Sequence, residues 1–267
     1  MKIATYNVNG IAGRLDILLG WLAQAEPDIV CLQELKAPQE KFPEKAIRDA
    51  GYDVIWHGQS RWNGVAMLSR VGEIHETRRG LPGDPGDEQS RYIEAAVGGI
   101  LVAGLYLPNG NPWPGPKFDY KMQWMARLDA HLTTLFDLDA PVVICGDFNV
   151  IPTDLDVYKP ANWKKDALFA PEAKAAYRRI LDQGWTDAIR YLHPEERIYS
   201  FWAYWRRSFE RNAGIRIDHL LLNKPAAKRL EAAGVDTRPR ALDKTSDHAP
   251  AWVELGNASA KRKRKAS

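Results

Sequence analysis

Acidic, amide and imidazole side chains recur where the sequence predicts the ends of apolar strands. They are Asn7, Asn9, Glu34, Tyr106, Asn109, Asp147, Asn149, Asp218, Asp247 and His248. An ionised acid beside a buried strand needs a partner, because an unpaired charge in an apolar environment is costly. If the strands lie side by side, their ends converge at one edge, where open sheets bind their ligands. These residues therefore predict one polar site.

A structural explanation exists for several of these residues taken alone. Asp247 and His248, in the stretch KTSDHAP, could cap a turn or lie on the solvated surface, since Asp is a common turn residue. Asn9 and Asn109 could likewise be turn residues. However, four acids and a histidine at strand ends are more than independent caps require, so we favour a shared site.

The residue types favour metal-assisted hydrolysis. Carboxylate and amide oxygens suit a hard cation, so Mg²⁺ is expected and Mn²⁺ is an alternative. Mg²⁺ typically takes only one or two protein carboxylates, which leaves the other acids free for proton transfer. The sequence has no Walker loop for a nucleotide cofactor, no GxSxG or activated-cysteine pattern, and no Cys/His spacing typical of zinc. Attack of metal-activated water on a phosphodiester fits best.

Short apolar strands and amphipathic helices must position these residues. Strand-like runs occupy 2–7, 28–33, 64–69, 91–97, 100–107, 142–147, 216–223 and 251–255. Apolar residues at three- and four-residue spacing predict helices over 11–24 and 117–136, and a third helix is expected at 171–183. Residues 78–90, rich in Gly, Pro and Asp, are predicted to form a surface loop. This pattern indicates a mixed sheet, or two sheets, with helices outside.

The composition indicates one folded body followed by a basic tail. The chain has 267 residues, of which 45% are hydrophobic and 27% charged. We expect a single domain over 1–256 and a disordered tail over 257–267. No apolar run is long enough to span a bilayer, and the start of the chain lacks a signal-peptide pattern. Two cysteines within apolar runs suggest buried free thiols, so a reducing, cytoplasmic location is expected.

The net charge of +3 is concentrated in the tail. The run KRKRK at 261–265 holds five positive charges, and without it 32 basic residues face 34 acidic ones. The body is therefore close to neutral, and the charge is no indication that the fold binds nucleic acid. The tail could attract a polyanion without specificity, or it could keep the chain soluble.

Residues 199–216, YSFWAYWRRSFERNAGIR, mix aromatic and basic side chains. The members are Phe201, Trp202, Tyr204, Trp205, Phe209, Arg206, Arg207, Arg211 and Arg216. A core segment would not need the arginines, and a solvated loop would not need the tryptophans. Aromatic rings stack on bases and arginines contact phosphates, so the segment is predicted to face nucleic acid. The alternative for Tyr204, Trp205 and Phe209 is a place in the core.

Six motifs in order resemble those of the exonuclease III family of abasic-site endonucleases, within the endonuclease/exonuclease/phosphatase superfamily. They are TYNVNG (5–10), LQELK (32–36), LYLPNG (105–110), GDFNVIPTDLDV (146–157), RIDHLLL (216–222) and SDHAP (246–250). The resemblance covers residues 1–255. It implies a deoxyribonuclease I-like four-layered α/β sandwich, with two mixed sheets packed face to face and helices outside.

The resemblance also implies a metal site at one edge of the sandwich. Glu34 is similar to the main metal ligand of the family. Asn7 and Asn9 would orient the ligands or metal-bound water, and Asp247 would anchor the metal directly or through water.

The remaining strand-end residues resemble the catalytic groups of the family. Asp147 would orient or deprotonate the attacking water, and Asn149 would hold that water or a phosphate oxygen. Tyr106 would support the scissile phosphate. His248 would donate to a phosphate oxygen, and Asp218 would accept its other ring proton.

The resemblance further suggests which residues bind the substrate. Phe201 and Trp202 would line the pocket for a flipped abasic sugar, and Ile215 stands where some relatives carry Trp. Asn109 would contact the phosphate backbone. Arg206, Arg207 and Lys121 are candidate phosphate contacts, with ordinary surface charge as the alternative. The sequence does not indicate a role for residues 158–170 in substrate binding.

Three functions follow as hypotheses. The favoured one is a Mg²⁺-dependent DNA repair nuclease that cuts 5′ to an abasic site, with 3′-to-5′ exonuclease and 3′-phosphatase activities. The second is an exonuclease-dominant sister enzyme with weak abasic incision. The third is a non-enzymatic DNA-binding module. The expected partner is double-stranded DNA with abasic sites or 3′ ends, and the protein is expected to be a monomer associated with the nucleoid.

Overall fold

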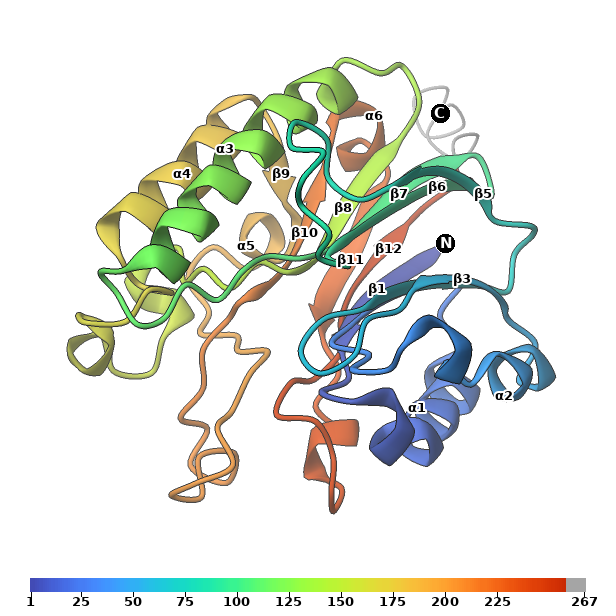
Figure 1. Cartoon of the computed structure of the whole chain (residues 1–267), viewed down its shortest axis with the longest axis horizontal. Helices are drawn as coiled ribbons and strands as arrows, with labels where there is room; N and C mark the ends of the chain where they lie inside the picture. The colour runs from blue at the N-terminus through green and yellow to red at the C-terminus, as the bar shows by residue number, and fades with distance from the viewer. Residues whose placement is uncertain (258–267) are drawn as a thin grey trace, which may run out of the picture.

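Two six-stranded mixed sheets pack face to face, with helices on their outer faces (Figure 1). The computed structural model describes residues 1–257. The four-layered sandwich predicted from the motifs is confirmed. The basic run at 261–265 lies outside the described residues. Among the helices of residues 1–257, none combines the length and apolarity needed to cross a bilayer.

The first sheet carries α1 (Ile11–Ala25) and α2 (Glu44–Asp49) on its outer face. Its strands run, in spatial order, β11 (Leu230–Val235), β12 (Ala251–Leu255), β1 (Lys2–Asn7), β2 (Ile29–Gln33), β4 (Val65–Ser69) and β3 (Asp53–His57).

The second sheet carries α3 (Pro116–Phe136) and α4 (Pro171–Asp182) on its outer face. Its strands run β5 (His75–Arg79), β6 (Tyr92–Val97), β7 (Ile100–Tyr106), β8 (Val142–Asp147), β10 (Asp218–Leu222) and β9 (Thr186–Asp187). The short helices α5 (Ala188–Leu192) and α6 (Lys224–Ala227) flank β10, and 3₁₀ turns occupy Gln39–Lys41, Asp154–Asp156, Pro160–Trp163 and Pro239–Ala241.

The central strands are apolar along their whole length because both of their faces are covered. Every residue of β2, β4, β8 and β10 is buried. One apolar core lies between the two sheets, and another lies between each sheet and its helices. Strands buried on both faces read as continuous apolar runs, which is why they could be predicted from the sequence.

The strand pairing brings the polar strand ends to one edge of the sandwich. β1 and β2 are parallel, with Asn7 opposite Gln33, so Glu34 follows directly beside Asn7. β7 and β8 are parallel, with Tyr106 opposite Asp147. β10 runs antiparallel to β8 and begins at this edge, with Asp218 also opposite Asp147. Figure 1 shows the loops before β10 (orange) and before β12 (red) extending from this same edge.

Strands β3, β5, β9 and β11 were not predicted, and the proposed loop at 78–90 is wrong at its start. Arg78 and Arg79 belong to β5 and pair with β6. All five side chains of β5 are exposed, so this edge strand shows no apolar alternation. Charged side chains on an exposed edge discourage pairing with another chain, which explains a strand of this composition.

The approach of β7 to β8 leaves no room for a side chain at Gly146. A Cβ there would lie 1.9 Å from the carbonyl oxygen of Leu105. We expect Gly146→Ala to lower the free energy of unfolding by at least about 3 kcal/mol, because backbone atoms must move. Urea denaturation measures this.

Gly20→Ala is the matched control, since its Cβ would meet nothing within 4 Å. Within α1 it should raise stability by about 0.5–1 kcal/mol. A Gly146→Ala protein as stable as wild type would contradict the close backbone approach.

Candidate active site

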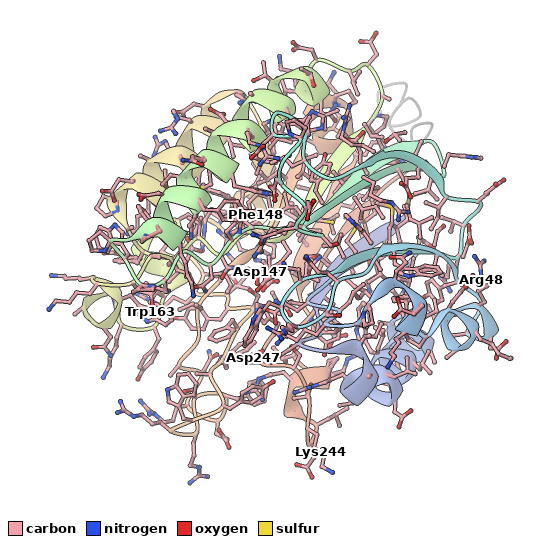
Figure 2. The ribbon with its side chains drawn as sticks, in the orientation of Figure 1. Arg48, Asp147, Phe148, Trp163, Lys244 and Asp247 are labelled. Atoms are coloured by element: carbon pink, nitrogen blue, oxygen red, sulfur yellow. The ribbon has the colours of Figure 1, made fainter. Side chains whose placement is uncertain are left out.

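Four residues at this edge have left-handed backbone conformations that are uncommon for residues other than glycine. Their φ angles are 48° at Asn9, 52° at Glu34, 50° at Lys36 and 47° at Asn149. Such conformations cost free energy and concentrate at functional sites. Figure 2 labels Asp147 and Asp247 in this region.

Glu34 is surrounded by hydrogen-bond donors. One carboxylate oxygen accepts from Asn7 Nδ2 at 3.0 Å and from the Tyr106 hydroxyl at 2.8 Å. The other oxygen lies 2.8 Å from Lys36 Nζ. Burial alone would raise the pKa of Glu34, but the hydrogen bonds from Asn7 and Lys36 outweigh it and the pKa is lowered. Glu34 is therefore ionised at neutral pH.

Two asparagines connect the acids to one another. Asn7 Nδ2 donates to Asp147 at 3.0 Å as well as to Glu34, so one amide bridges two carboxylates. Asn9 Nδ2 donates to Asp247 at 2.9 Å, and Asn9 Oδ1 accepts from Lys36 at 2.5 Å. Both residues contact the acids, and the hydrogen bond from Asn9 to Asp247 goes beyond what a turn residue alone requires.

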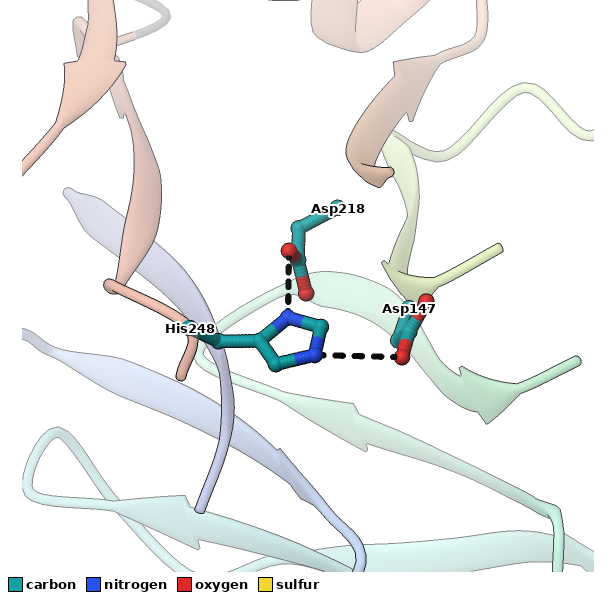
Figure 3. A group of neighbouring side chains, drawn as sticks. All are labelled: Asp147, Asp218 and His248. Atoms are coloured by element: carbon teal, nitrogen blue, oxygen red, sulfur yellow. Dashed lines mark hydrogen bonds and ion pairs between the residues drawn. The ribbon is translucent and has the colours of Figure 1, made fainter. Parts of the chain in front are cut away.

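His248 lies between two aspartates (Figure 3). Its Nδ1 is 2.8 Å from Asp218 Oδ2, and its Nε2 is 3.7 Å from Asp147 Oδ2. Burial alone would lower the pKa of His248, but the charge and hydrogen bond of Asp218 outweigh it and raise the pKa to about 10. The ring is thus held as a cation. It can donate from Nε2 while Asp218 holds the other ring proton.

Asp147 is a buried acid that lies close to other acids. Its pKa is raised chiefly by burial and further by the charges of Asp218 and Glu34, against the opposing charge of His248. The backbone N–H of Asn149 donates to Asp147 Oδ1 at 2.9 Å. A carboxylate with a raised pKa in this position can accept a proton from water at neutral pH.

Two groups of donors could hold a metal ion. Single ligand atoms of Asp147, Asp218 and His248 all lie within 4.8 Å of one another. His248 and Asp218 are already bonded to each other, however, and a hard cation prefers oxygen ligands. Glu34 offers such oxygens, and the Lys36 ammonium 2.8 Å away shows that positive charge is favourable beside it. Asp247 is connected to the same ammonium through Asn9. The donor types at this edge therefore suit a hard divalent cation.

A cavity of about 720 Å³ opens beside these residues. Of the predicted substrate-binding residues, Asn109, Phe201 and Arg206 line it. Trp202 does not line it: the side chain is buried against Tyr199 and Ala249. Its indole N–H donates to Asn212 at 3.1 Å, so packing and a satisfied N–H hold it inward. Arg207 is exposed but is not part of the lining.

The prediction that Lys121 contacts phosphate is wrong. Its side chain is fully buried. Nζ donates to the carbonyl oxygens of Asn149 at 2.6 Å, Asn109 at 3.1 Å and Ala167 at 3.5 Å. Burial lowers the pKa of Lys121 to about 7, against the charges of Asp147 and Asp166. Lys121 therefore ties together three loops around the cavity.

Two contributions escaped the sequence analysis. Lys36, two residues after Glu34 in LQELK, forms an ion pair with Glu34. Only its spacing from Glu34 could have suggested this contact. The Ser200 hydroxyl donates to Asp218 Oδ2 at 2.6 Å and accepts from the Asp218 N–H at 3.1 Å. Nothing in the local sequence marks Ser200, because the contact depends on the path of the loop before β10.

A second cavity of about 620 Å³ lies on the other side of Tyr106 and Asn109. Arg61, Trp62, Arg91 and Lys117 line it. Trp62 has 71% of its surface exposed, and the Arg91 guanidinium lies 4.8 Å from the centre of the Tyr106 ring. The site is therefore flanked by basic and aromatic side chains that the sequence analysis did not single out.

Lys121→Met should change how stability depends on pH. The pKa of Lys121 is lowered in the folded protein, so the unfolded chain binds more protons and wild-type stability rises with pH. Relative to the variant, we expect a gain of up to about 1.4 kcal/mol per pH unit between about pH 7 and pH 10. Urea denaturation of both proteins across this range measures the difference. A parallel pH dependence would contradict the lowered pKa.

Asp218→Asn should release the proton of His248. Without the charge of Asp218, burial dominates, and we expect the pKa of His248 to fall by at least about 2 pH units. An NMR titration of the imidazole signals in the presence of EDTA measures this. His193, whose pKa is raised by Glu196, is the internal control. An unchanged pKa at His248 would show that Asp218 does not hold its charge.

The comparisons with known proteins agree with the fold and the motifs. The sequence matches the Endonuclease/Exonuclease/phosphatase family over residues 4–248. Exodeoxyribonuclease III of Haemophilus influenzae is 35% identical over 267 residues, covering 96% of this chain and 100% of the relative. The structure of an AP endonuclease from Archaeoglobus fulgidus is 40% identical, with a TM-score of 0.92 and coverage of 96% of this chain and 99% of that one.

A 3′ phosphatase from Neisseria, solved bound to a product DNA hairpin, is 39% identical with a TM-score of 0.92. The match covers 96% of this chain and 100% of that one. Similarity of this extent spans the sandwich and every polar strand end. The chain therefore belongs to the Endonuclease/Exonuclease/phosphatase family.

Proposed function

We propose that this protein is a DNA repair nuclease that hydrolyses the phosphodiester 5′ to an abasic site and also acts at 3′ ends as an exonuclease and phosphatase. The observation that carries the proposal is a set of acids and a protonated His248 beside a cavity with an apolar wall. Relatives of similar length are an exodeoxyribonuclease III, an AP endonuclease and a 3′ phosphatase.

Glu34 and Asp247 are proposed to hold Mg²⁺, or Mn²⁺, with Asn7 and Asn9 orienting these ligands. The bound metal would supply positive charge to a phosphate oxygen and lower the pKa of an attacking water. Asn7 already bridges Glu34 to Asp147, so the metal ligand and the proposed base are held at a fixed separation.

Four groups are proposed to act on the scissile phosphate. Asp147 orients the water and takes its proton, and Asn149 holds the water or a phosphate oxygen. His248 donates from Nε2 to a phosphate oxygen, because Asp218 occupies Nδ1. Tyr106 lines the cavity next to Glu34, and its hydroxyl, which donates to Glu34 in this structure, would donate to the phosphate.

DNA is the proposed partner because of the side chains beside the acids. Arg206 lines one cavity, and Arg61, Arg91 and Lys117 line the other, which gives phosphate contacts on both sides. Phe201 lies edge-on to His248, 5.1 Å between ring centres, and supplies an apolar wall for a sugar turned out of the duplex. We propose residues 1–256 as the catalytic domain, acting as a monomer in the cytoplasm near the nucleoid.

The exonuclease-dominant enzyme remains the second candidate, since one pocket could receive both an abasic sugar and a 3′ end. A non-enzymatic DNA-binding module is a poorer fit. Without a cation, Glu34, Asp147, Asp218 and Asp247 would repel phosphate and weaken such a module.

The test is incubation with two duplexes, in Mg²⁺ or in EDTA. One duplex carries a single tetrahydrofuran residue, which cannot undergo β-elimination, and the other is undamaged with a recessed 3′ end. We expect a rapid Mg²⁺-dependent nick 5′ to the tetrahydrofuran, slower trimming of the recessed end, and no cleavage in EDTA. Trimming without the nick would favour the exonuclease, and no cleavage of either duplex would overturn the DNA-nuclease assignment.

Glu34→Gln keeps the size of the side chain but removes its charge. We expect the nicking rate to fall at least about 100-fold. Glu254→Gln is the matched control, because Glu254 is a half-exposed residue of β12 whose one ion pair within residues 1–257 is with Lys2. Equal rates for the two variants would contradict the role of Glu34.

A further inference from the structure

Two loops extend from the edge of the sandwich that carries the active site (Figure 1). Residues 199–216, which we call the aromatic segment, precede β10. Residues 236–250, which we call the β11–β12 loop, carry Asp247 and His248. The contacts between the two loops therefore help to set the position of Asp247.

Backbone hydrogen bonds join the two loops next to the active site. The N–H of Trp202 donates to the carbonyl of Asp247 at 2.8 Å, and the N–H of Ala249 donates to the carbonyl of Ser200 at 2.8 Å. The backbone of Asp247 is thus held by the aromatic segment, and its position depends on how Trp202 is held in turn.

Arg240 reaches from the β11–β12 loop into the aromatic segment. Its side chain is buried, and a terminal guanidinium nitrogen donates to the carbonyl of Trp202 at 2.9 Å. The guanidinium carbon lies 5.5 Å from the centre of the Tyr204 ring and 5.1 Å from the centre of the Phe209 ring. Both distances are within the range of cation–π attraction. Arg240 therefore holds both the backbone of Trp202 and the ring of Tyr204.

No acid neutralises the charge of Arg240. Among residues 1–257, no carboxylate forms an ion pair with this side chain, and its Nε has no hydrogen-bond partner. Burying a charge is costly unless other groups compensate for it. The two rings and the carbonyl compensate only while the guanidinium stays in this place, so a geometric role explains Arg240 better than a contribution to stability.

The Tyr204 hydroxyl continues the contacts to the side chain of Asp247. It donates to a carbonyl of the β11–β12 loop at 2.9 Å and accepts from Asn9 Nδ2 at 3.1 Å. The same amide of Asn9 donates to Asp247 Oδ1 at 2.9 Å. Arg240 is thus linked to the backbone of Asp247 through one peptide and to its carboxylate through two side chains.

We propose that Arg240 is a positioning residue that orients Asp247 toward the divalent cation. This inference rests on the proposed function, in which Asp247 helps to hold the metal. Arg240 lines neither of the two cavities described above, so it acts through Asp247 rather than on the substrate. Loss of a residue that orients a metal ligand typically lowers metal affinity by about 10- to 100-fold.

The sign of the change in metal affinity separates positioning from a direct effect of charge. A cation repels a nearby divalent ion, so removing the charge of Arg240 would strengthen metal binding if charge alone mattered. Loss of the orientation of Asp247 would weaken metal binding instead. The two explanations therefore predict opposite changes.

The test is a titration of the full-length protein with Mn²⁺ in the absence of DNA, in which electron paramagnetic resonance measures the free Mn²⁺. We expect Arg240→Met to raise the Kd for Mn²⁺ about 10-fold, because Asp247 is no longer held in place. An unchanged or lower Kd would overturn the inference.

Arg238→Met is the matched control, because it removes the same charge two residues away on the same loop. The Arg238 side chain is exposed and forms an ion pair with Asp236. Since an exposed ion pair contributes little, the Kd for Mn²⁺ should stay within about twofold of the wild-type value. Equal losses in Arg238→Met and Arg240→Met would show a general effect of the loop and would overturn the inference.

Tyr204→Phe tests the same contacts without removing a buried charge. Tyr204 is 49% exposed, so this variant should fold, and its ring can still lie against Arg240. The hydroxyl that holds Asn9 is lost, so we expect the Kd for Mn²⁺ to rise at least about threefold. If circular dichroism shows that Arg240→Met does not fold, an unchanged Kd in Tyr204→Phe would overturn the inference.

The nicking rate on the tetrahydrofuran duplex gives a second readout. In Arg240→Met, the Mg²⁺ concentration for half of the maximal rate should rise about 10-fold, and excess Mg²⁺ should restore most of the rate. A rate that stays equally low at every Mg²⁺ concentration would overturn the inference. Failure of the wild-type protein to nick would instead overturn the proposed nuclease function, and the Mn²⁺ titration would still decide the role of Arg240.

Discussion

The crowding of carboxylates at one edge of the sandwich is the constraint on which the rest of the site depends. Glu34, Asp147, Asp218 and Asp247 gather at this edge, where Asp147 and Asp218 are almost fully buried, and unpaired charges in such a place are costly. Neutral and positive donors separate them: Asn7 bridges Glu34 to Asp147, and His248 stands between Asp218 and Asp147. The burial that makes this arrangement costly also raises the pKa of Asp147 and, through Asp218, keeps His248 charged. The raised pKa of Asp147 and the raised pKa of His248 are thus two outcomes of one electrostatic arrangement.

A buried arginine holds the wall of the cavity against this polar edge. Arg216 lies between the cavity residues Ile215 and Ile217, and its side chain is fully buried. It contacts Asp156 at 2.7 Å and Asp187 at 2.9 Å, which joins the loop after β8 to β9 and β10. A buried ion pair adds little stability compared with apolar residues, but breaking it is expensive. The contribution of these Arg216 ion pairs is geometric, because they fix the start of β10 and therefore the position of Asp218.

The prediction succeeded where a residue's role follows from its place on a strand. Asp147 is the last residue of β8, and Asp218 is the first residue of β10. Both faces of these strands are covered, so their apolar runs predicted the position of each aspartate to within a residue or two. The sequence-based prediction failed where the role of a residue depends on the direction in which its side chain points. Trp202 was expected in the pocket, and Lys121 was a candidate for a phosphate contact or for surface charge, yet both side chains are buried. Strand β5 was not predicted, because all of its side chains are exposed and it has no apolar face that could mark it in the sequence.

The sequence by itself determined the family, the layered fold and the types of side chain that meet at the active edge. Ordered motifs and buried strands are local in the chain, and they can be read without knowing which segments touch. Only the tertiary structure decided how those side chains are used. The bridge made by Asn7, the contact of Ser200 with Asp218 and the pairing of Ile215 with both Phe201 and Val157 join residues far apart in sequence. Such contacts depend on which strands lie side by side and on the path of the loops between them, and a local sequence pattern does not give either.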